Sequence, residues 1–413
     1  MATRLSRIHP YPAMVADGLA EALARAFVAP GDRVLDPFCG TGRILAAAAE
    51  KGAHCVGVDV NPLAVLVTRA KAGHCSAQVL SDLLQASSLV RARGKRRDLP
   101  RFETDRKVAW FSRKVTRELW GIVGLVNSAR LPTPELSLVA TVLAATVREV
   151  SFCRDGQWKL HRLPARLRRR WRRSPWAVFR RRLELALCEV RAFPDCPGRL
   201  RALVGDARQL SGALRAHRIT PSFDIVVTSP PYGDSRTTVH YGGISSLCLS
   251  VLCYIERLGV AAASSASIDR LCLGGATSAS PAQTNSGVAA SALHHYWRGG
   301  QNNPVQTRVR RFLEDLERSC QEVTRVLRPG GHFVVVVGRR RTGGWRLYLD
   351  RMIIDVCREE GLRLEGLSTR QIVGKRTPAR VDTLGRQQAK AHVIDTIKEE
   401  HILVFSKRSK PVS

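Results

Sequence analysis

A strand, a glycine-rich turn, a helix and a second strand follow one another between residues 33 and 59. The stretch 33–36, Arg-Val-Leu-Asp, predicts a short strand that runs into the turn at 37–42, whose sequence is Pro-Phe-Cys-Gly-Thr-Gly. An alanine-rich helix is expected over 44–51, and the stretch 54–59 predicts the second strand. This order is typical of a parallel βαβ unit in a doubly wound α/β sheet.

The same unit has the features of a nucleotide-type cofactor site. Gly40 and Gly42 let the backbone approach a ligand closely, and the following helix points its N-terminus at it. Asp59 ends the second strand, where its carboxylate can accept hydrogen bonds from both ribose hydroxyls. Asn61 and Pro62 then cap and begin the next helix.

The identity of the cofactor follows from two details of the turn. The dinucleotide fingerprint requires a third glycine, and Leu45 stands at that position. Asp36 precedes the turn, where it would repel a pyrophosphate but could bind the amino group of a methionine moiety. S-adenosylmethionine therefore fits this turn better than a nicotinamide dinucleotide.

A second turn carries a different chemistry. The apolar run 223–227 predicts a buried strand, and Ser229-Pro230-Pro231-Tyr232 follows it closely. Both prolines fix φ and lack an N–H group, so nearby carbonyls can accept hydrogen bonds from a ligand. Beside a hydroxyl and an aromatic ring, they suit an amino group on a planar base. The alternative is an ordinary loop with two prolines.

The remaining elements extend the same pattern. Asp206 is expected to end a third strand over 203–206, at the sheet edge of Asp59 and near the adenine. The other expected elements are a first helix over 14–27, helices over 108–126, 136–150, 309–327 and 347–360, and strands over 332–337 and 402–405.

The chain is strongly basic. Its formal net charge is +31 and its sequence pI is about 10.9, which indicates a polyanionic partner, nucleic acid first and an acidic membrane second. Between residues 154 and 201, 15 lysines and arginines face four acidic residues, with Trp158, Trp171 and Trp176 interleaved. Phosphate contacts and base stacking would use this composition, although a solvated basic helix face would also produce it. The candidate nucleic-acid contacts are Arg168, Arg169, Arg170, Arg172, Arg173 and Arg236.

Cysteine usage and hydropathy bear on the compartment. None of the eleven cysteines forms a C-x-x-C pair or a zinc-type cluster, so we expect reduced thiols and no metal site. No run approaches the 18 apolar residues of a membrane span, and the N-terminus has no hydrophobic segment. We therefore expect a soluble, cytoplasmic protein without a membrane partner.

These motifs together resemble the amino-methylating DNA methyltransferases, specifically the Ser-Pro-Pro-Tyr group that makes N4-methylcytosine. The stretches that carry the resemblance are His9-Pro10-Tyr11-Pro12-Ala13, Asp36 to Gly42, Asp59-Val60-Asn61-Pro62 and Ser229 to Tyr232. Further stretches are similar to one branch of the family: 149–151, 233–239, 241–242, 370–372 and 375–378. Arg43 departs from the family pattern, in which a small or hydroxylated residue is usual after the glycine turn.

The resemblance implies a fold, a cofactor and a partner. The fold would be a doubly wound, mostly parallel, seven-stranded Rossmann-like methyltransferase sheet with a helical basic insertion. Residues 1–75 and 202–413 would form the core, and 76–201 the DNA-recognition insertion. The partner would be double-stranded DNA, and a cognate restriction endonuclease is left open as a second one.

Site residues follow from the same resemblance. Ser229, Pro230, Pro231 and Tyr232 would be catalytic, with Ser229 and the Pro230 carbonyl accepting from the base amino group and Tyr232 stacking on the flipped base. S-adenosylmethionine would be held by Tyr11, Pro12, Asp36, Phe38, Gly40, Thr41, Gly42, Asp59, Asn61 and Asp206.

Several alternatives stay open. Adenine-N6 methylation usually has Asp or Asn in place of Ser229, and an RNA guanine-N2 methyltransferase shares the turn at 36–42. Only about 30 residues precede the first strand, so the upstream RNA-binding domain of that second class is not expected. An inactive DNA-binding relative is a third reading. Cytosine-C5 methylation would need a Pro-Cys dipeptide, which the chain lacks. A long mobile loop is expected over 261–304, either as a target-reading element or as an inert insertion.

Overall fold

A computed structural model describes residues 5, 8–12, 14–16, 18–89, 109–154, 160–192, 197–233, 240–275, 304–342, 345–372, 380–381, 394–395 and 399–408. Its main sheet contains β1 (Arg33–Asp36), β2 (His54–Asp59), β3 (Arg199–Val204), β4 (Phe223–Thr228), β5 (Leu327–Gly338), β8 (Leu362–Gln371) and β11 (Glu399–Lys407). The strand order is β3-β2-β1-β4-β5-β11-β8. The predicted mostly parallel seven-stranded sheet is confirmed.

The strand directions follow from the connections. β2 and β3, β1 and β4, and β4 and β5 pair in parallel, and each of these links along the chain contains at least one helix. β11 runs antiparallel to both β5 and β8. β5 is valine-rich and its last six residues are buried, as expected for an interior strand.

Two compact units make up the chain. The first comprises residues 1–31, 39–204 and 239–269; the second comprises 32–38, 205–238 and 270–413.

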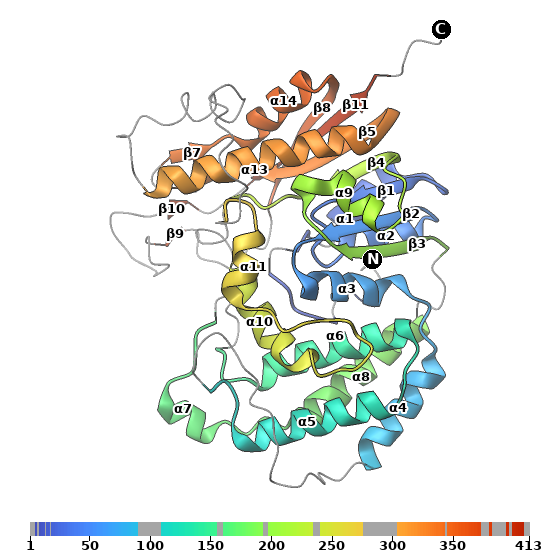
Figure 1. Cartoon of the computed structure of the whole chain (residues 1–413), viewed down its shortest axis with the longest axis vertical. Coiled ribbons are helices and arrows are strands. Elements are labelled where there is room, and N and C mark those ends of the chain that lie inside the picture. Colours follow the sequence, from blue (N-terminus) through green and yellow to red (C-terminus); the bar gives the residue numbers. More distant parts are fainter. Residues whose placement is uncertain are drawn as a thin grey trace. The chain divides into compact units, whose positions relative to one another are not determined.

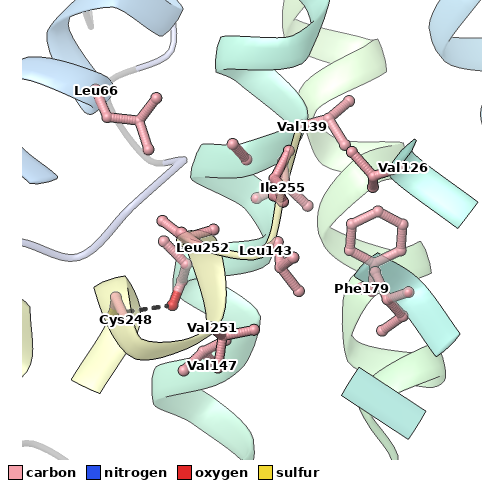
Figure 2. Close-up of a cluster of buried hydrophobic side chains, with 14 of the residues drawn as sticks. Leu66, Val126, Val139, Leu143, Val147, Phe179, Cys248, Val251, Leu252 and Ile255 are labelled. Carbon is pink, nitrogen blue, oxygen red and sulfur yellow. Dashed lines mark hydrogen bonds between the residues drawn. The ribbon is translucent and has the colours of Figure 1, made fainter. Parts of the chain in front are cut away.

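The first unit is mainly helical. It contains α1 (Leu19–Phe27), α2 (Arg43–Glu50), α3 (Pro62–Ala72), α4 (Ala77–Leu89), α5 (Arg113–Ser128), α6 (Thr133–Val150), α7 (Ala165–Arg170), α8 (Pro175–Ala192), α10 (Tyr241–Leu252) and most of α11 (Ser265–Leu271). α6 is mostly apolar and is buried along nearly its whole length, in contact with α3, α8 and α10. Figure 2 shows its residues Val139, Leu143 and Val147 among side chains of the neighbouring helices, where the Cys248 thiol donates to the Ala144 carbonyl.

The second unit holds most of the sheet. Besides β1, β4, β5, β8 and β11 it contains η1 (Ala207–Gln209), α9 (Leu210–Ala216), α13 (Pro304–Val326), α14 (Leu349–Glu359) and the strand pairs β6 (Arg340–Thr342) with β7 (Trp345–Leu347) and β9 (Arg380–Val381) with β10 (Ile394–Asp395). α13 and α14 pack on each other and against β5 (Figure 1).

Three expectations about elements are corrected. The first helix begins at Leu19 and not at residue 14, because Gly18 before it has φ of 82°, outside the helical region. The third strand ends at Val204, so Asp206 lies beyond it. Within the expected loop 261–304, residues 265–271 form α11, and 276–303 lie outside the described residues.

Two kinds of feature are absent from the described residues. No helix among them combines the length and apolar character that a bilayer crossing requires. No cluster of His, Cys, Asp or Glu side chains within those same ranges could hold a metal ion.

Candidate active site

In the second unit, Asp36 lies beside the strand that leads into the Ser-Pro-Pro-Tyr turn. β1 and β4 pair in parallel with Val34 opposite Ile225 and Leu35 opposite Val226, so their carboxyl ends lie side by side. The Thr228 hydroxyl donates to Asp36 Oδ1 at 2.6 Å. Asp36 is buried and also accepts the Phe38 N–H at 3.0 Å, which shapes the start of the glycine-rich turn. The structure therefore brings Asp36 and the residue before Ser229 together.

The Ser-Pro-Pro-Tyr turn continues into a hydrogen-bonded chain. Ser229 Oγ lies 3.0 Å from the Tyr232 hydroxyl, and that hydroxyl donates to Glu400 Oε1 at 3.0 Å. Arg370 Nε lies 3.1 Å from Glu400 Oε2. Sequence reasoning missed Glu400 because it follows Tyr232 by 168 residues and has no motif around it. The stretch 370–372 is similar to one branch of the family, but that similarity assigned no role to Arg370.

In the first unit, the glycine-rich turn has the conformation that its sequence predicts. Gly40 and Gly42 have φ of 50° and 68°, in the left-handed region where glycine carries no penalty. A Cβ on Gly42 would lie 2.5 Å from Thr68 Cγ2, whereas a Cβ on Gly40 would meet nothing within 4 Å. The Thr68 hydroxyl donates to the Gly40 carbonyl at 2.9 Å, and Lys71 Nζ donates to the Thr41 carbonyl at 2.7 Å. The backbone at Gly40 thus borders open space.

Asp59 lies against this turn. Its carboxylate accepts the Gly40 N–H at 2.9 Å and the Asn61 N–H at 2.8 Å. Burial raises the pKa of Asp59 to about 6, although both N–H donors act to lower that pKa. Each carboxylate oxygen keeps a second lone pair that can accept a further hydrogen bond.

Asn61 and Tyr11 form hydrogen bonds next to Asp59 that fix the residues around the glycine-rich turn. Asn61 Oδ1 accepts the Leu63 N–H at 3.1 Å, and Asn61 Nδ2 donates to the Tyr11 hydroxyl at 2.7 Å and to Ser245 Oγ at 2.8 Å. Asn61 and Tyr11 are both buried. These bonds occupy both amide protons of Asn61, so its side chain fixes the start of α3 and the segment at Tyr11 and Pro12.

Asp206 belongs to another network, in the second unit. Arg208 donates to both of its carboxylate oxygens, at 2.6 to 3.0 Å, and also reaches the buried Asp315 at 2.9 Å. The Asp206 carboxylate further accepts the Arg208 N–H, which begins η1. All of these bonds are internal to the protein and do not test the adenine contact of Asp206. That contact therefore stays a prediction.

The arginine-rich segment divides into exposed and structural side chains. Arg169, Arg170 and Arg172 are exposed at the end of α7. Arg168 and Arg173 are partly buried, above the rings of Phe152 and Trp171 at 5.9 and 4.3 Å from the ring centroids. Arg236 lies outside the described residues.

One of the three tryptophans of this segment differs from expectation. Trp176 is 7% exposed, and its ring packs beside Gly121 within the helical core, so base stacking by Trp176 is wrong. Trp171 is partly exposed, with its ring N–H bound to the Val150 carbonyl at 3.1 Å. Trp158 lies outside the described residues.

Comparison with known proteins supports the family resemblance. Residues 3–68, which include the glycine-rich turn and Asp59, match the model of the DNA methylase family. The chain is 26% identical over 395 residues to the type II methyltransferase M.MvaI of Kocuria varians, covering 91% of this chain and 85% of that protein. Over most of its length the chain is therefore similar to a DNA methyltransferase, which confirms the resemblance to the DNA amino-methyltransferases.

Two looser matches accompany these. A tRNA (guanine(10)-N2)-dimethyltransferase of Methanothermobacter thermautotrophicus is 39% identical over 74 residues, 17% of this chain and 22% of that one. A TehB-like S-adenosylmethionine-dependent methyltransferase structure from Corynebacterium glutamicum aligns over 94% of this chain and 87% of that chain, at 10% identity and a TM-score of 0.30. Nothing about the site follows from so distant a structural match.

The family's methyl donor is S-adenosylmethionine, and the residues present fit it. The open space at Gly40 admits a ligand to the turn, and the Asp59 carboxylate retains acceptor capacity for hydroxyl groups. S-adenosylmethionine is the cofactor of this DNA methyltransferase.

The pKa of Asp59 predicts a pH dependence of cofactor affinity. If the Asp59 carboxylate accepts the ribose hydroxyls, binding favours its ionised form, so affinity is highest well above pH 6 and falls as the pH drops through about 6. We expect the dissociation constant for S-adenosylmethionine to rise as much as about 10-fold per pH unit below that value. Calorimetric titrations between pH 5 and 8 measure it. Asp59→Asn should remove this pH dependence; an unchanged slope in Asp59→Asn would contradict the assignment.

Proposed function

We propose that this DNA methyltransferase transfers the methyl group of S-adenosylmethionine to the exocyclic N4 amino group of cytosine in DNA, at specific sites. The observation that carries the proposal is the hydrogen bond from Thr228 to Asp36. It joins the acid that would bind the methionine amino group to the turn that would hold the base. Serine at position 229 favours cytosine within this family resemblance.

The cofactor contacts are proposed residue by residue. Asp36 would accept from the methionine amino group, the turn from Gly40 through Thr41 to Gly42 would line the donor with backbone, and Asp59 would bind the ribose hydroxyls. Tyr11, Pro12 and Asn61 would support this turn, and Phe38 and Asp206 would complete the contacts, as the resemblance implies. Once bound, S-adenosylmethionine supplies a methyl group whose carbon–sulfur bond breaks with its electron pair left on sulfur.

The Ser-Pro-Pro-Tyr turn would act on the base. The cytosine amino lone pair is delocalised into the ring, which makes the nitrogen a poor nucleophile. Ser229 Oγ and the Pro230 carbonyl would accept from the two amino protons and localise that lone pair. Pro231 would keep the turn rigid and Tyr232 would stack on the flipped base. Orientation of the amino nitrogen toward the methyl group then supplies most of the rate.

A labelling experiment tests the proposal. The protein is incubated with methyl-labelled S-adenosylmethionine and either amplified, methyl-free genomic DNA or total RNA, and the products are digested to nucleosides. We expect label in DNA, in N4-methylcytosine. Label in N6-methyladenine, label in RNA alone, or cofactor binding without transfer would overturn it, and each outcome corresponds to one of the alternative activities.

We further propose that residues 76–201 read the DNA and that 1–75 and 202–413 form the catalytic core. The support is the exposure of Arg169, Arg170 and Arg172 at the end of α7, with no acidic partner among the described residues. Exposed guanidinium groups without an acidic partner inside the protein are available to phosphates.

Replacing those three arginines by glutamine should weaken DNA binding about 10-fold or more at moderate salt. The slope of log affinity against log salt should become shallower by about 0.9 for each phosphate that is no longer neutralised. Fluorescence anisotropy over a salt series measures both quantities. A charge-matched control replaces Arg215, Arg311 and Arg358, which are also exposed. Equally weakened binding in the two triple variants would contradict a specific role for the α7 segment.

A further inference from the structure

The hydrogen bonds that link Ser229, Tyr232 and Glu400 all donate in the same direction, toward Glu400. The Tyr232 hydroxyl has a single proton, and it donates this proton to Glu400 Oε1. The contact of 3.0 Å between Ser229 and Tyr232 must therefore use the Ser229 proton, with the Tyr232 oxygen accepting. Ser229 Oγ then presents lone pairs, and no proton, to a group approaching it. The Glu400 carboxylate, acting through Tyr232, thus makes Ser229 a hydrogen-bond acceptor.

Glu400 is held where it can act in this way. On β11 it stands opposite Arg370 of β8 and opposite Gly338 of β5 in the two antiparallel ladders. The Arg370 side chain lies against Glu400 Oε2, on the carboxylate oxygen that does not bind Tyr232. Glu400 and Arg370 keep only 16% and 28% of their side-chain surface exposed. The position of Glu400 is thus set by the sheet on one side and by an ion pair on the other.

We propose that Glu400, through Tyr232, orients Ser229 as the acceptor for the base amino group and takes up the proton that this group releases on methylation. The inference rests on the proposed function. Methylation leaves the amino nitrogen with one proton more than the product carries. Ser229 Oγ takes that proton while its own proton passes to the Tyr232 oxygen and the Tyr232 proton passes to Glu400 Oε1. Glu400 ends as the carboxylic acid and loses its proton to water, so protons and charge balance.

The geometry also explains why serine can serve at this position. A serine hydroxyl by itself is a weak proton acceptor, whereas a carboxylate is a strong one. Two contacts of 3.0 Å place the Glu400 carboxylate within reach of Ser229 without bringing it to the base directly. Glu400 and Arg370 are positioning residues in this scheme, because they act through Tyr232 and Ser229.

Glu400→Gln is the most informative variant, because its amide oxygen can still accept from Tyr232 while its charge is gone. With methyl-labelled S-adenosylmethionine and amplified genomic DNA, we expect kcat to fall about 10- to 100-fold. The dissociation constants for the cofactor and for the DNA should stay within about twofold of the wild-type values. Glu400→Asp should recover part of the missing turnover. Glu365→Gln is the matched control, an acid on β8 that pairs with Arg363 and Ser406 and not with the turn.

The split between kcat and KM separates the proposal from a merely structural role. Glu400→Gln should lower kcat at saturating cofactor and DNA, while both KM values stay within about twofold of wild type and Glu400→Asp restores part of kcat. Unchanged kcat in Glu400→Gln, or no recovery in Glu400→Asp, would overturn the inference while leaving the proposed function intact. If the wild-type protein transfers no methyl group to cytosine in DNA, the proposed function itself fails. A thermal melting curve shared by Glu400→Gln and Glu365→Gln identifies reduced turnover as a change in chemistry and not in folding.

Discussion

Ser229→Ala should reduce methyl transfer about 100-fold or more, while the dissociation constant for S-adenosylmethionine changes less than twofold. Alanine removes the hydroxyl that would accept from the base amino group, and removing one such polar group from an active site typically costs a factor of about 100 to 1,000 in kcat. The fold should be unaffected, because Ser229 follows the end of β4 and its only hydrogen bond between described side chains is to Tyr232. Single-turnover transfer of labelled methyl groups to amplified DNA measures the reduction.

Ser222→Ala is the control for this variant. Ser222 lies just before β4 in the same unit and is similarly half-buried. Its replacement should leave both transfer and cofactor binding at wild-type levels. Full activity in Ser229→Ala would refute the role assigned to its hydroxyl. Equally reduced transfer in the two variants would instead point to a general effect of serine removal near β4.

Gly42→Ala should damage the cofactor half of the site. Alanine at a φ of 68° costs about 1 kcal/mol, and its Cβ would lie 2.5 Å from Thr68 Cγ2, so one of the two must move. Thr68 holds the Gly40 carbonyl, so movement of Thr68 would displace the turn. We expect a decrease of about 2–4 kcal/mol in the free energy of unfolding and a cofactor affinity lowered at least 10-fold. Chemical denaturation and calorimetry measure these two quantities.

Two further variants separate strain from collision. Gly259→Ala has nearly the same φ, 66°, but its Cβ would meet nothing within 4 Å, so we expect a decrease of only about 1 kcal/mol. Thr68→Ser removes Cγ2 and keeps the hydroxyl, so the double variant Gly42→Ala/Thr68→Ser should regain part of the cofactor affinity. If Gly259→Ala and Gly42→Ala are equally destabilised, the close approach to Thr68 is not the cause.

The parts of the site that the sequence predicts are those whose residues are neighbours along the chain. The turn from Asp36 to Gly42 follows a strand and precedes a helix, and a parallel sheet places such turns at its carboxyl edge. The alternation of strands and helices also indicates a parallel sheet with the Ser-Pro-Pro-Tyr turn at the same edge, but not that β1 and β4 are neighbours, on which the Thr228–Asp36 contact depends.

The parts that it does not predict depend on long-range register. Glu400 reaches Tyr232 only because β11 inserts between β5 and β8 in antiparallel orientation. β8 is a sheet edge with one buried residue, and its alternation of apolar and charged residues covers only 362–365, which is short for predicting a ten-residue strand. Trp176 shows a related limit. Its arginine-rich neighbourhood suggested nucleic-acid stacking, but the side chain faces the helical core.

The most direct test is the identity of the methylated nucleoside in cells. A bacterial host without its own DNA methylation expresses either the wild-type chain or Ser229→Ala, and its DNA is digested to nucleosides and analysed by mass spectrometry. We predict N4-methylcytosine in the wild-type sample and its near absence in the Ser229→Ala sample. N6-methyladenine in place of N4-methylcytosine, or no methylated nucleoside in DNA from cells that contain the folded wild-type protein, would contradict the account.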